Sequence, residues 1–330
     1  MLFSLLNVPP ASASTAAGSG SAGAPGAGAG LAAAGVPAAP RVPKRGPHAL
    51  REGAARALFA AAAALSIAAV ALICLFLLAN GVPAMAEIGL PEFLFGTTWR
   101  PANDLYGIFP MIVGSLYVTA GAMIVGVPGG LLTALYLSRF ARGRTGSFLR
   151  SGVELLAGIP SVVYGFFGLV IIVPFVRLLG PGTGLSVLAA SLILGIMILP
   201  TVITVAQSAL DAVPARYYEG ALALGVDHEH AVFKVVAPAA ASGIMAAIVL
   251  GLGRAIGETM AVVMVAGNMP IIPDSLLSGV RTMTANIVLE MGYAADLHRE
   301  ALIATGVVLF VFILLITMLL NVIRKRGEAR

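Results

Sequence analysis

The chain has 330 residues, of which 59% are apolar and only 11% are charged. A soluble domain carries about 25% charged residues, because its surface must be covered with them. The composition therefore excludes a soluble globular protein and a long disordered one. The net charge of +5 is interpreted by position along the chain, not as a nucleic-acid signal. The one cysteine, Cys74, excludes a disulfide framework and a cysteine-based metal site.

Residues 1–47 are rich in Ala, Gly, Pro and Ser and lack hydrophobic periodicity, which predicts a disordered cytoplasmic tail. The tail lacks the basic start and the apolar core of a secretory signal. The stretch from Gly18 to Gly23 matches the GxGxxG pattern. No strand precedes it and no helix comes after it, so the stretch does not indicate a nucleotide site.

Six intervals are apolar and long enough to cross a bilayer as a helix, which takes about 18 residues or more. They predict an all-α, polytopic membrane protein. Residues 48–106 would hold the first transmembrane helix and an outer loop. The six transmembrane helices are expected near residues 57–79, 108–138, 154–176, 184–209, 239–267 and 301–323.

The basic residues are divided unevenly between the two sides of these helices. Fifteen of the 20 Lys and Arg residues lie on the side that holds both ends of the chain. Four lie on the other side, and Arg254 lies within a predicted helix. Because cytoplasmic segments carry the excess of basic residues, both termini are predicted to be cytoplasmic.

The cytoplasmic segment 210–238 carries signals for two short helices joined at a glycine. Pro214 suits a first helical turn, and Gly225 can take the left-handed conformation that ends a helix. Asp227 can cap a second helix that stops before Pro238. The segment is either a knob that docks in another protein's groove or a connector that packs on its own bundle. The apolar positions of the two helices are Tyr218, Ala221, Leu222 and Phe233.

The sequence contains neither of the two common motifs for ATP hydrolysis and zinc catalysis. No GxxxxGK[ST] loop occurs, so the chain does not hydrolyse ATP by a P-loop mechanism, and no HExxH zinc motif occurs. The run His228-Glu229-His230 lies in a charged loop, and we interpret it as solvated residues. We therefore expect no catalytic residue, no metal and no cofactor in this chain.

The segment 210–238 resembles the EAA loop of ABC-importer permeases, whose pattern is EAA, three residues, G, nine residues, then I-x-L-P. In that family the loop inserts into a cleft of the nucleotide-binding subunit. The resemblance thus implies that the matching residues couple this chain to an ATPase. The residues that match are Glu219, Ala221, Gly225 and Pro238, and the departures are Gly220, Val235 and Ala237.

Four further segments resemble the phosphate-specific transport permeases, and the PstC type above all. They are Leu156–Gly165, Ile196–Thr201, Gly253–Met260 and Arg281–Asn286. The resemblance implies a type I ABC-importer permease (MetI-like) architecture for residues 107–330, in the bacterial cytoplasmic (inner) membrane and surrounded by lipid. It implies a heterodimer with a second related permease subunit, two copies of an ATPase subunit that uses the ATP, and an extracytoplasmic phosphate-binding protein.

Arg254 and Glu258 are ionisable residues at membrane depth, where a charge costs at least ~2.5–3.5 kcal/mol. Their spacing of four would place both side chains on one face of a helix, and Gly253 and Gly257 would permit close packing. Two interpretations stay open. The pair is a structural ion pair that locks two helices, or it lines an anion path in which the guanidinium gives phosphate two parallel hydrogen bonds.

Weaker candidates for the substrate path are Ser161, Tyr164 and Thr259, each of which could equally be satisfied by a hydrogen bond between helices. Arg281, Thr282, Thr284 and Asn286 lie before the last transmembrane helix. That segment is either a re-entrant helix at the outer mouth or an amphipathic helix on the surface.

The expected function is a permease subunit that moves inorganic phosphate by alternating access. One rival is an ABC permease for another oxyanion, such as molybdate or sulfate. A carboxylate beside the path disfavours a fully ionised dianion, whereas protonated phosphate can donate a hydrogen bond to it. The second rival is a channel or a membrane scaffold that transports nothing, and neither needs an EAA-type loop.

Overall fold

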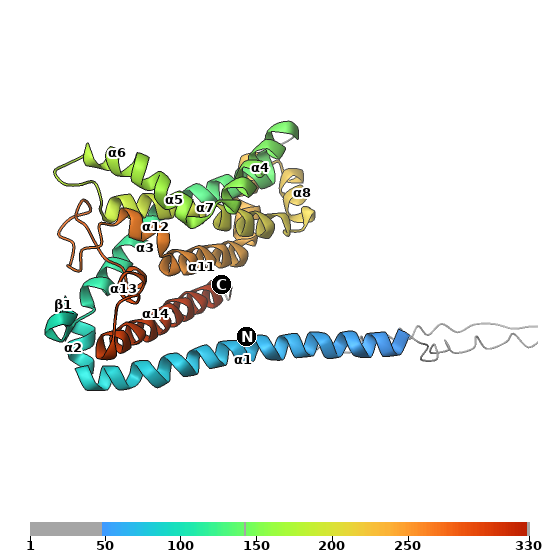
Figure 1. Ribbon diagram of the computed structural model, residues 1–330. Coiled ribbons are helices and arrows are strands. Elements are labelled where there is room, and N and C mark those ends of the chain that lie inside the picture. Colours follow the sequence, from blue (N-terminus) through green and yellow to red (C-terminus); the bar gives the residue numbers. More distant parts are fainter. Residues whose placement is uncertain (1–47, 142, 329–330) are drawn as a thin grey trace, which may run out of the picture. The chain divides into compact units, whose positions relative to one another are not determined.

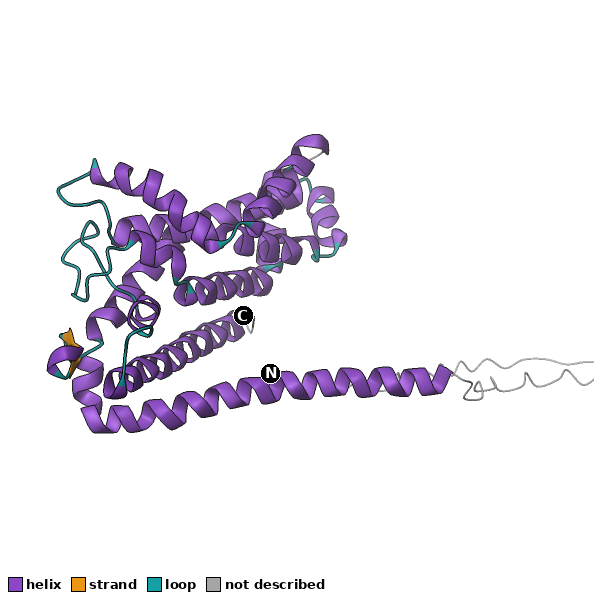
Figure 2. Ribbon diagram, viewed as in Figure 1, coloured by secondary structure: helices purple, strands orange, loops and turns teal. Residues whose placement is uncertain are grey.

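The computed structural model of the chain describes residues 48–141 and 143–328, and helices dominate it (Figures 1 and 2). The predicted disordered tail, residues 1–47, lies outside the described residues. The chain divides into two compact units, Met1–Ala62 and Ala63–Arg330. Of the first unit, the structure describes only the beginning of the first helix. The packed helices and the candidate site belong to the second unit.

The helices and strands succeed one another along the chain in this order. The first half comprises α1 (His48–Ile88), α2 (Leu90–Phe95), β1 (Trp99–Arg100), the 3₁₀-helix η1 (Pro101–Asn103), β2 (Leu105–Tyr106), α3 (Phe109–Leu135), the π-helix η2 (Tyr136–Phe140), α4 (Gly143–Gly158), α5 (Ser161–Phe167), the π-helix η3 (Gly168–Ile172) and α6 (Val173–Arg177). The second half comprises α7 (Val187–Asp211), α8 (Ala215–Ala223), α9 (His228–Ala231), the π-helix η4 (Val232–Val236), α10 (Ala237–Ala239), α11 (Ala241–Gly257), α12 (Met260–Val265), α13 (Met283–Glu290) and α14 (Asp296–Glu328).

The membrane-spanning helices confirm the all-α class. Four helical segments of the described chain are long and apolar enough to cross a membrane unbroken: Glu52–Ile88, Phe109–Phe140, Val187–Asp211 and Asp296–Val322. Two further pairs are bent, Gly143–Gly158 with Ser161–Arg177 by 98° and His228–Ala239 with Ala241–Gly257 by 71°. The predicted number of six is reached when each bent pair counts as one span.

Two of the predicted helices are interrupted. The one expected over 154–176 breaks at Pro160, which has no N–H and pushes the residue before it out of helical conformation. The one expected over 239–267 breaks between α11 and α12. Apolar length identified both segments as candidates to span the membrane, but it carries no information about a break in the helix within them.

Helix α7 is the centre of the second unit, and α3, α4, α11 and α12 all pack against it. Gly126 and Gly130 of α3, four residues apart, let the two helices come close, as small residues do in membranes. A Cβ on Gly126 would lie 2.7 Å from the carbonyl oxygen of Gly195, and one on Gly130 would lie 2.8 Å from Val202.

A cluster of buried hydrophobic side chains joins α2, β1 and the start of α3 to the last helix, α14. It includes the buried side chains of Phe93, Trp99, Met111 and Leu302. Strands β1 and β2 pair antiparallel, with Trp99 opposite Tyr106. The indole N–H of Trp99 donates to Glu290 over 2.8 Å, which ties this hairpin to the end of α13.

Glu290 is a buried carboxylate with partners from three segments. Arg281 donates to it over 2.6 Å and His298 contacts it at 2.9 Å, while Arg281 also donates to Asn286 over 3.0 Å. Because Asn286 is fully buried and Thr284 nearly so, α13 is an interior helix. The interpretation of this segment as a surface amphipathic helix is therefore wrong.

The close contact of α3 with α7 predicts that Gly126→Ala destabilises the protein by about 1–3 kcal/mol, the cost of overpacking a core. Gly129→Ala is the matched control, because its Cβ would lie an ordinary 3.4 Å from Leu199. Thermal denaturation in detergent, monitored by size-exclusion chromatography, measures both. Equal stability of the two variants would contradict a close α3–α7 contact.

The cluster around Glu290 predicts that Glu290→Ala destabilises the protein by about 3 kcal/mol or more, since it leaves the guanidinium of Arg281 buried without its counter-charge. Glu300→Ala removes an exposed carboxylate near the start of α14 and serves as the control. The same denaturation assay applies. A Glu290 variant as stable as the Glu300 variant would show that the buried ion pair contributes nothing.

Candidate functional site

The candidate site lies where the helix that carries Arg254 breaks. Helix α11 ends at Gly257, and Glu258 has extended backbone angles of φ −68° and ψ 138°. Helix α12 begins at Met260. The predicted stacking of Arg254 and Glu258 on one helix face is therefore wrong, because that face exists only in a continuous helix.

Arg254 has a different partner from the one expected. Its guanidinium donates to the hydroxyl of Thr201, on α7, over 3.2 Å. The ion pairs within the described residues do not include one between Arg254 and Glu258. Thr201 ends a segment that carries the family resemblance, but nothing in the sequence singles it out as a site residue. A helical threonine is common, and only packing brings this one to an arginine 53 residues away.

The break itself is held by hydrogen bonds. The hydroxyl of Thr284, on α13, donates to the carbonyl oxygen of Glu258 over 2.9 Å. The side chain of Glu258 accepts a long bond of 3.5 Å from the backbone N–H of Ala261, in the first turn of α12. The hydroxyl of Thr259 donates to the carbonyl of Gly257 over 3.3 Å. Glu258 and Thr259 are half-buried, and each makes one of the hydrogen bonds at the break.

The face of α11 that carries Arg254 is open. Leu250, one turn before Arg254 on α11, is 53% exposed, and Arg254 itself is exposed; Met260, at the start of α12, is 42% exposed. A Cβ on Gly253 or on Gly257 would meet no described atom within 4 Å. This side of the helix break is therefore uncovered within the described part of the chain.

The second broken segment packs against the first. Helix α5 lies against α12, where a Cβ on Gly165 would come within 2.9 Å of Ala261. Tyr164 is buried, and its hydroxyl donates to the carbonyl of Leu156 over 2.7 Å, across the bend between α4 and α5. The hydroxyl of Tyr164 thus braces the bend. Ser161 begins α5 and is half-buried.

The segment 210–238 folds largely as predicted. Helix α8 is succeeded by Gly225 with φ 84°, and Asp227 caps α9 by accepting from the N–H of His230 over 2.9 Å. That backbone bond, with the side-chain bond to the same histidine, holds the pKa of Asp227 below its usual value. The second helix does not stop before Pro238 but continues through η4 and α10 to Ala239.

This segment has one face on its own bundle and one face free. Ala221 is buried, and the hydroxyl of Tyr218 lies 2.7 Å from Nδ1 of His228. The His228 ring meets the ring of Phe140, at the end of η2, at 4.6 Å between centroids. The inner contacts agree with the interpretation of the loop as a connector that packs on its own bundle, and docking of the free face on another protein stays a prediction. The exposed residues include Glu219, Leu222, Leu224, Phe233 and Pro238.

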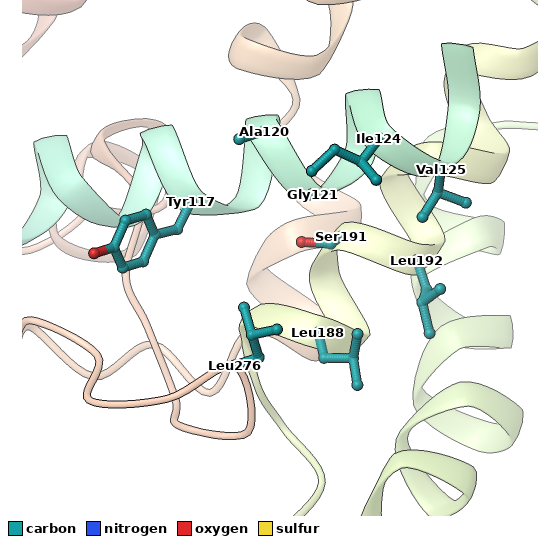
Figure 3. A pocket seen from close by; sticks show the side chains of 9 residues that line it. All are labelled: Tyr117, Ala120, Gly121, Ile124, Val125, Leu188, Ser191, Leu192 and Leu276. Carbon is teal, nitrogen blue, oxygen red and sulfur yellow. The ribbon is translucent and has the colours of Figure 1, made fainter. Parts of the chain in front are cut away.

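No site for a metal is present in the part of the chain that the structure describes, where no three His, Cys, Asp or Glu side chains converge. A hollow between α3 and α7 is a poor candidate for an anion site (Figure 3). Ser191 and Tyr117 carry its side-chain oxygens, and Ser191 already donates to the carbonyl of Val118 over 3.3 Å. The other lining side chains are apolar, so this hollow suits hydrocarbon.

Curated proteins of similar sequence are transport permeases. Over 286 residues the chain is 36% identical to the probable ABC transporter permease protein YqgH of Bacillus subtilis, covering 84% of this chain and 93% of that one. Over 303 residues it is 32% identical to the phosphate transport system permease protein PstC of Mesorhizobium japonicum, covering 86% and 92%.

Solved structures agree on the fold. Two crystal forms of the inward-facing MetNI methionine ABC transporter match with TM-scores of 0.51 and 0.52, each at 21% sequence identity. The matches cover 67% and 70% of this chain, and 94% and 99% of those chains. They confirm the expected MetI-like architecture.

The family assignment rests on the sequence of residues 126–328. They match the family described as binding-protein-dependent transport system inner membrane component. Permeases of this kind lie in the inner membrane, are not themselves catalytic, and associate with ATPase subunits and a substrate-binding protein. The resemblance to ABC-importer permeases is confirmed, and the chain belongs to the family of binding-protein-dependent transport system inner membrane components.

Proposed function

We propose that this chain is the permease subunit of an ATP-driven importer that moves inorganic phosphate across the cytoplasmic membrane by alternating access. Several curated relatives, each 32% identical over most of this chain, are named phosphate transport system permease proteins. The observation that carries the proposal is the guanidinium of Arg254, exposed on an open face of a membrane-spanning helix without a carboxylate partner among the described residues.

An exposed arginine at membrane depth is energetically unfavourable, so its presence calls for a compensating interaction. A charged residue there costs at least ~2.5–3.5 kcal/mol and ordinarily faces a water-filled path or a bundle interior. The ion pair that would offset this cost is missing between Arg254 and Glu258, so the structural interpretation loses its support. An anion that passes the open face of α11 would supply the counter-charge. Arginine suits phosphate because its planar fork gives two parallel hydrogen bonds.

Glu258 favours phosphate over its rivals in this proposal. Its half-buried carboxylate comes four residues after Arg254 in the sequence, just past the end of α11, and would repel a fully ionised dianion such as sulfate or molybdate. Protonated phosphate can instead donate a hydrogen bond to a carboxylate. We assign the path to Arg254, Glu258, Thr259 and Ser161, and we give Tyr164 the bracing role at the α4–α5 bend.

The open face of α11 also supports a heterodimer with a second related permease subunit, which would close the path from the other side. The exposed face of segment 210–238 supports docking on one of two ATPase copies, through Glu219, Ala221, Gly225 and Pro238. A channel or a scaffold that transports nothing needs no such face. ATP would be hydrolysed on those partner subunits, and an external phosphate-binding protein would deliver the anion.

The orientation in the membrane is inferred from charge. Fifteen of the 20 Lys and Arg residues lie on the side that carries segment 210–238 and both chain ends. The excess of basic residues favours the cytoplasm for that side. Segment 210–238 would then face the cytoplasmic ATPase, as docking requires.

The proposal predicts that Arg254→Gln lowers phosphate uptake at least about tenfold in vesicles with matched amounts of assembled transporter. A hydrogen bond to a charged group contributes about 1.5–3 kcal/mol, and about 1.4 kcal/mol is a factor of ten in rate. Arg254→Lys keeps the charge but not the fork, so it should retain part of the activity. Arg177→Gln, at the exposed end of α6, is the control. Near-normal uptake by Arg254→Gln would remove Arg254 from the path.

A second prediction concerns the loop. Gly225 has φ 84°, so Gly225→Val strains the turn by about 1–2 kcal/mol, although a Cβ there would meet no described atom. The variant should stay in the membrane and lose co-purification with the ATPase or ATP-driven uptake.

Gly220→Ala is the matched control for the loop. Gly220 lies inside α8 with open space around it, and alanine favours a helix by about 0.5–1 kcal/mol over glycine. It also restores the alanine of the family pattern. Normal assembly and uptake in Gly225→Val, or a loss in Gly220→Ala that equals it, would contradict the role of the turn.

A further inference from the structure

Thr201 of α7 lies where the two central helices of the site come close. A Cβ on Gly251 of α11 would be 2.9 Å from Val202, so the helices touch at this level. Arg254, one turn further along α11, donates to the hydroxyl of Thr201 over 3.2 Å. Thr201 is half-buried, and Arg254 is exposed. The threonine therefore stands at the edge of the open face.

The hydroxyl proton of Thr201 has no acceptor within the described residues. Several threonine hydroxyls inside the long helices donate to the carbonyl of the residue four positions earlier, as in Thr133 of α3, Thr204 of α7 and Thr305 of α14. Thr201 makes no such bond, and its oxygen accepts from Arg254 instead. A hydroxyl both accepts and donates, so accepting from the guanidinium leaves its own proton free for another acceptor.

We propose that Thr201 and Arg254 together form the anion subsite of the transport path, with the Thr201 hydroxyl donating to one oxygen of a tetrahedral oxyanion that the guanidinium also binds. The proposal rests on the proposed function and names a specificity-determining residue for it. A guanidinium in a fixed fork reaches two oxygens of such an anion, and a neutral donor at its side adds a third bond without adding charge. The anion is thus held without being trapped by a second cation.

The test uses the complete transporter, with its partner subunits and binding protein, in vesicles supplied with phosphate and ATP. Thr201→Val has the shape of threonine without the hydroxyl, and Thr201→Ser keeps the hydroxyl. We expect Thr201→Val to lower the maximal uptake rate about three- to tenfold, the effect of one hydrogen bond, and Thr201→Ser to restore most of it. ATP hydrolysis should persist, so that phosphate moved per ATP falls.

The matched control is Thr204→Val, the same change one turn along α7. The Thr204 hydroxyl already donates to the carbonyl of Pro200 over 2.8 Å, so its loss should leave uptake unchanged. If Thr204→Val lowers uptake as much as Thr201→Val, the effect comes from helix packing and the proposal is overturned. Full activity of Thr201→Val overturns it as well.

A double variant separates contact with the anion from mere support of Arg254. In the Arg254→Lys background, Thr201→Val should still lower uptake about threefold, because the hydroxyl bonds to the anion itself. If the effect vanishes there, Thr201 only positions the guanidinium, and the proposed contact is overturned.

Failure of the proposed function would look different from failure of this inference. If the unaltered complex moves another oxyanion and not phosphate, the proposed substrate is wrong. The comparison of Thr201→Val with Thr201→Ser then tests the subsite with that anion. A complex that moves no oxyanion overturns both.

Discussion

A helix that breaks within a membrane exposes backbone groups that lipid cannot satisfy, and the candidate site depends on the hydrogen bonds that satisfy these groups at one such break. The hydroxyl of Thr284 donates to the carbonyl oxygen of Glu258 over 2.9 Å, and the Glu258 carboxylate accepts from the N–H of Ala261. These bonds replace the helical ones lost where α11 ends. They hold the chain at Glu258, directly after the last turn of α11, which carries Arg254. The interior position of α13, which supplies Thr284, is secured at its other end by Glu290.

Helix α7 provides the surface against which the broken segments are placed. It is buried along most of its length and touches α3 through glycines that leave no room for a side chain. A rigid central helix of this kind gives Arg254 a fixed neighbour in Thr201, and it lets α5 and α12 pack beside one another. The geometry of the candidate site thus comes from three different segments, none of which contains the whole site.

The segment 210–238 has the contacts needed to connect a docked partner with the membrane helices. Tyr218, His228 and Phe140 link its inner face to the end of the long α3–η2 helix, while its outer face keeps Leu222, Leu224 and Phe233 exposed. A displacement of the outer face by a docked partner would reach the membrane helices through these ring contacts. In the proposed function, ATP-driven movement of the docked ATPase would be transmitted from segment 210–238 to the membrane helices by this route.

The sequence by itself determined the all-α fold class, the apolar segments, the family and the turn at Gly225. These depend on local properties: apolar length, charge distribution, glycine conformation and motif spacing. It also indicated Arg254 and Glu258 as ionisable residues at membrane depth, but it placed them on one continuous helix face. Only the tertiary structure decided that the helix ends at Gly257, that Arg254 meets Thr201 and that Glu290 gathers Trp99, Arg281 and His298. The physical reason is that a helix break, a buried ion pair or a contact across 53 residues becomes favourable only when other segments satisfy its polar groups. The hydrophobic periodicity of one segment does not show which residues of other segments will be its partners.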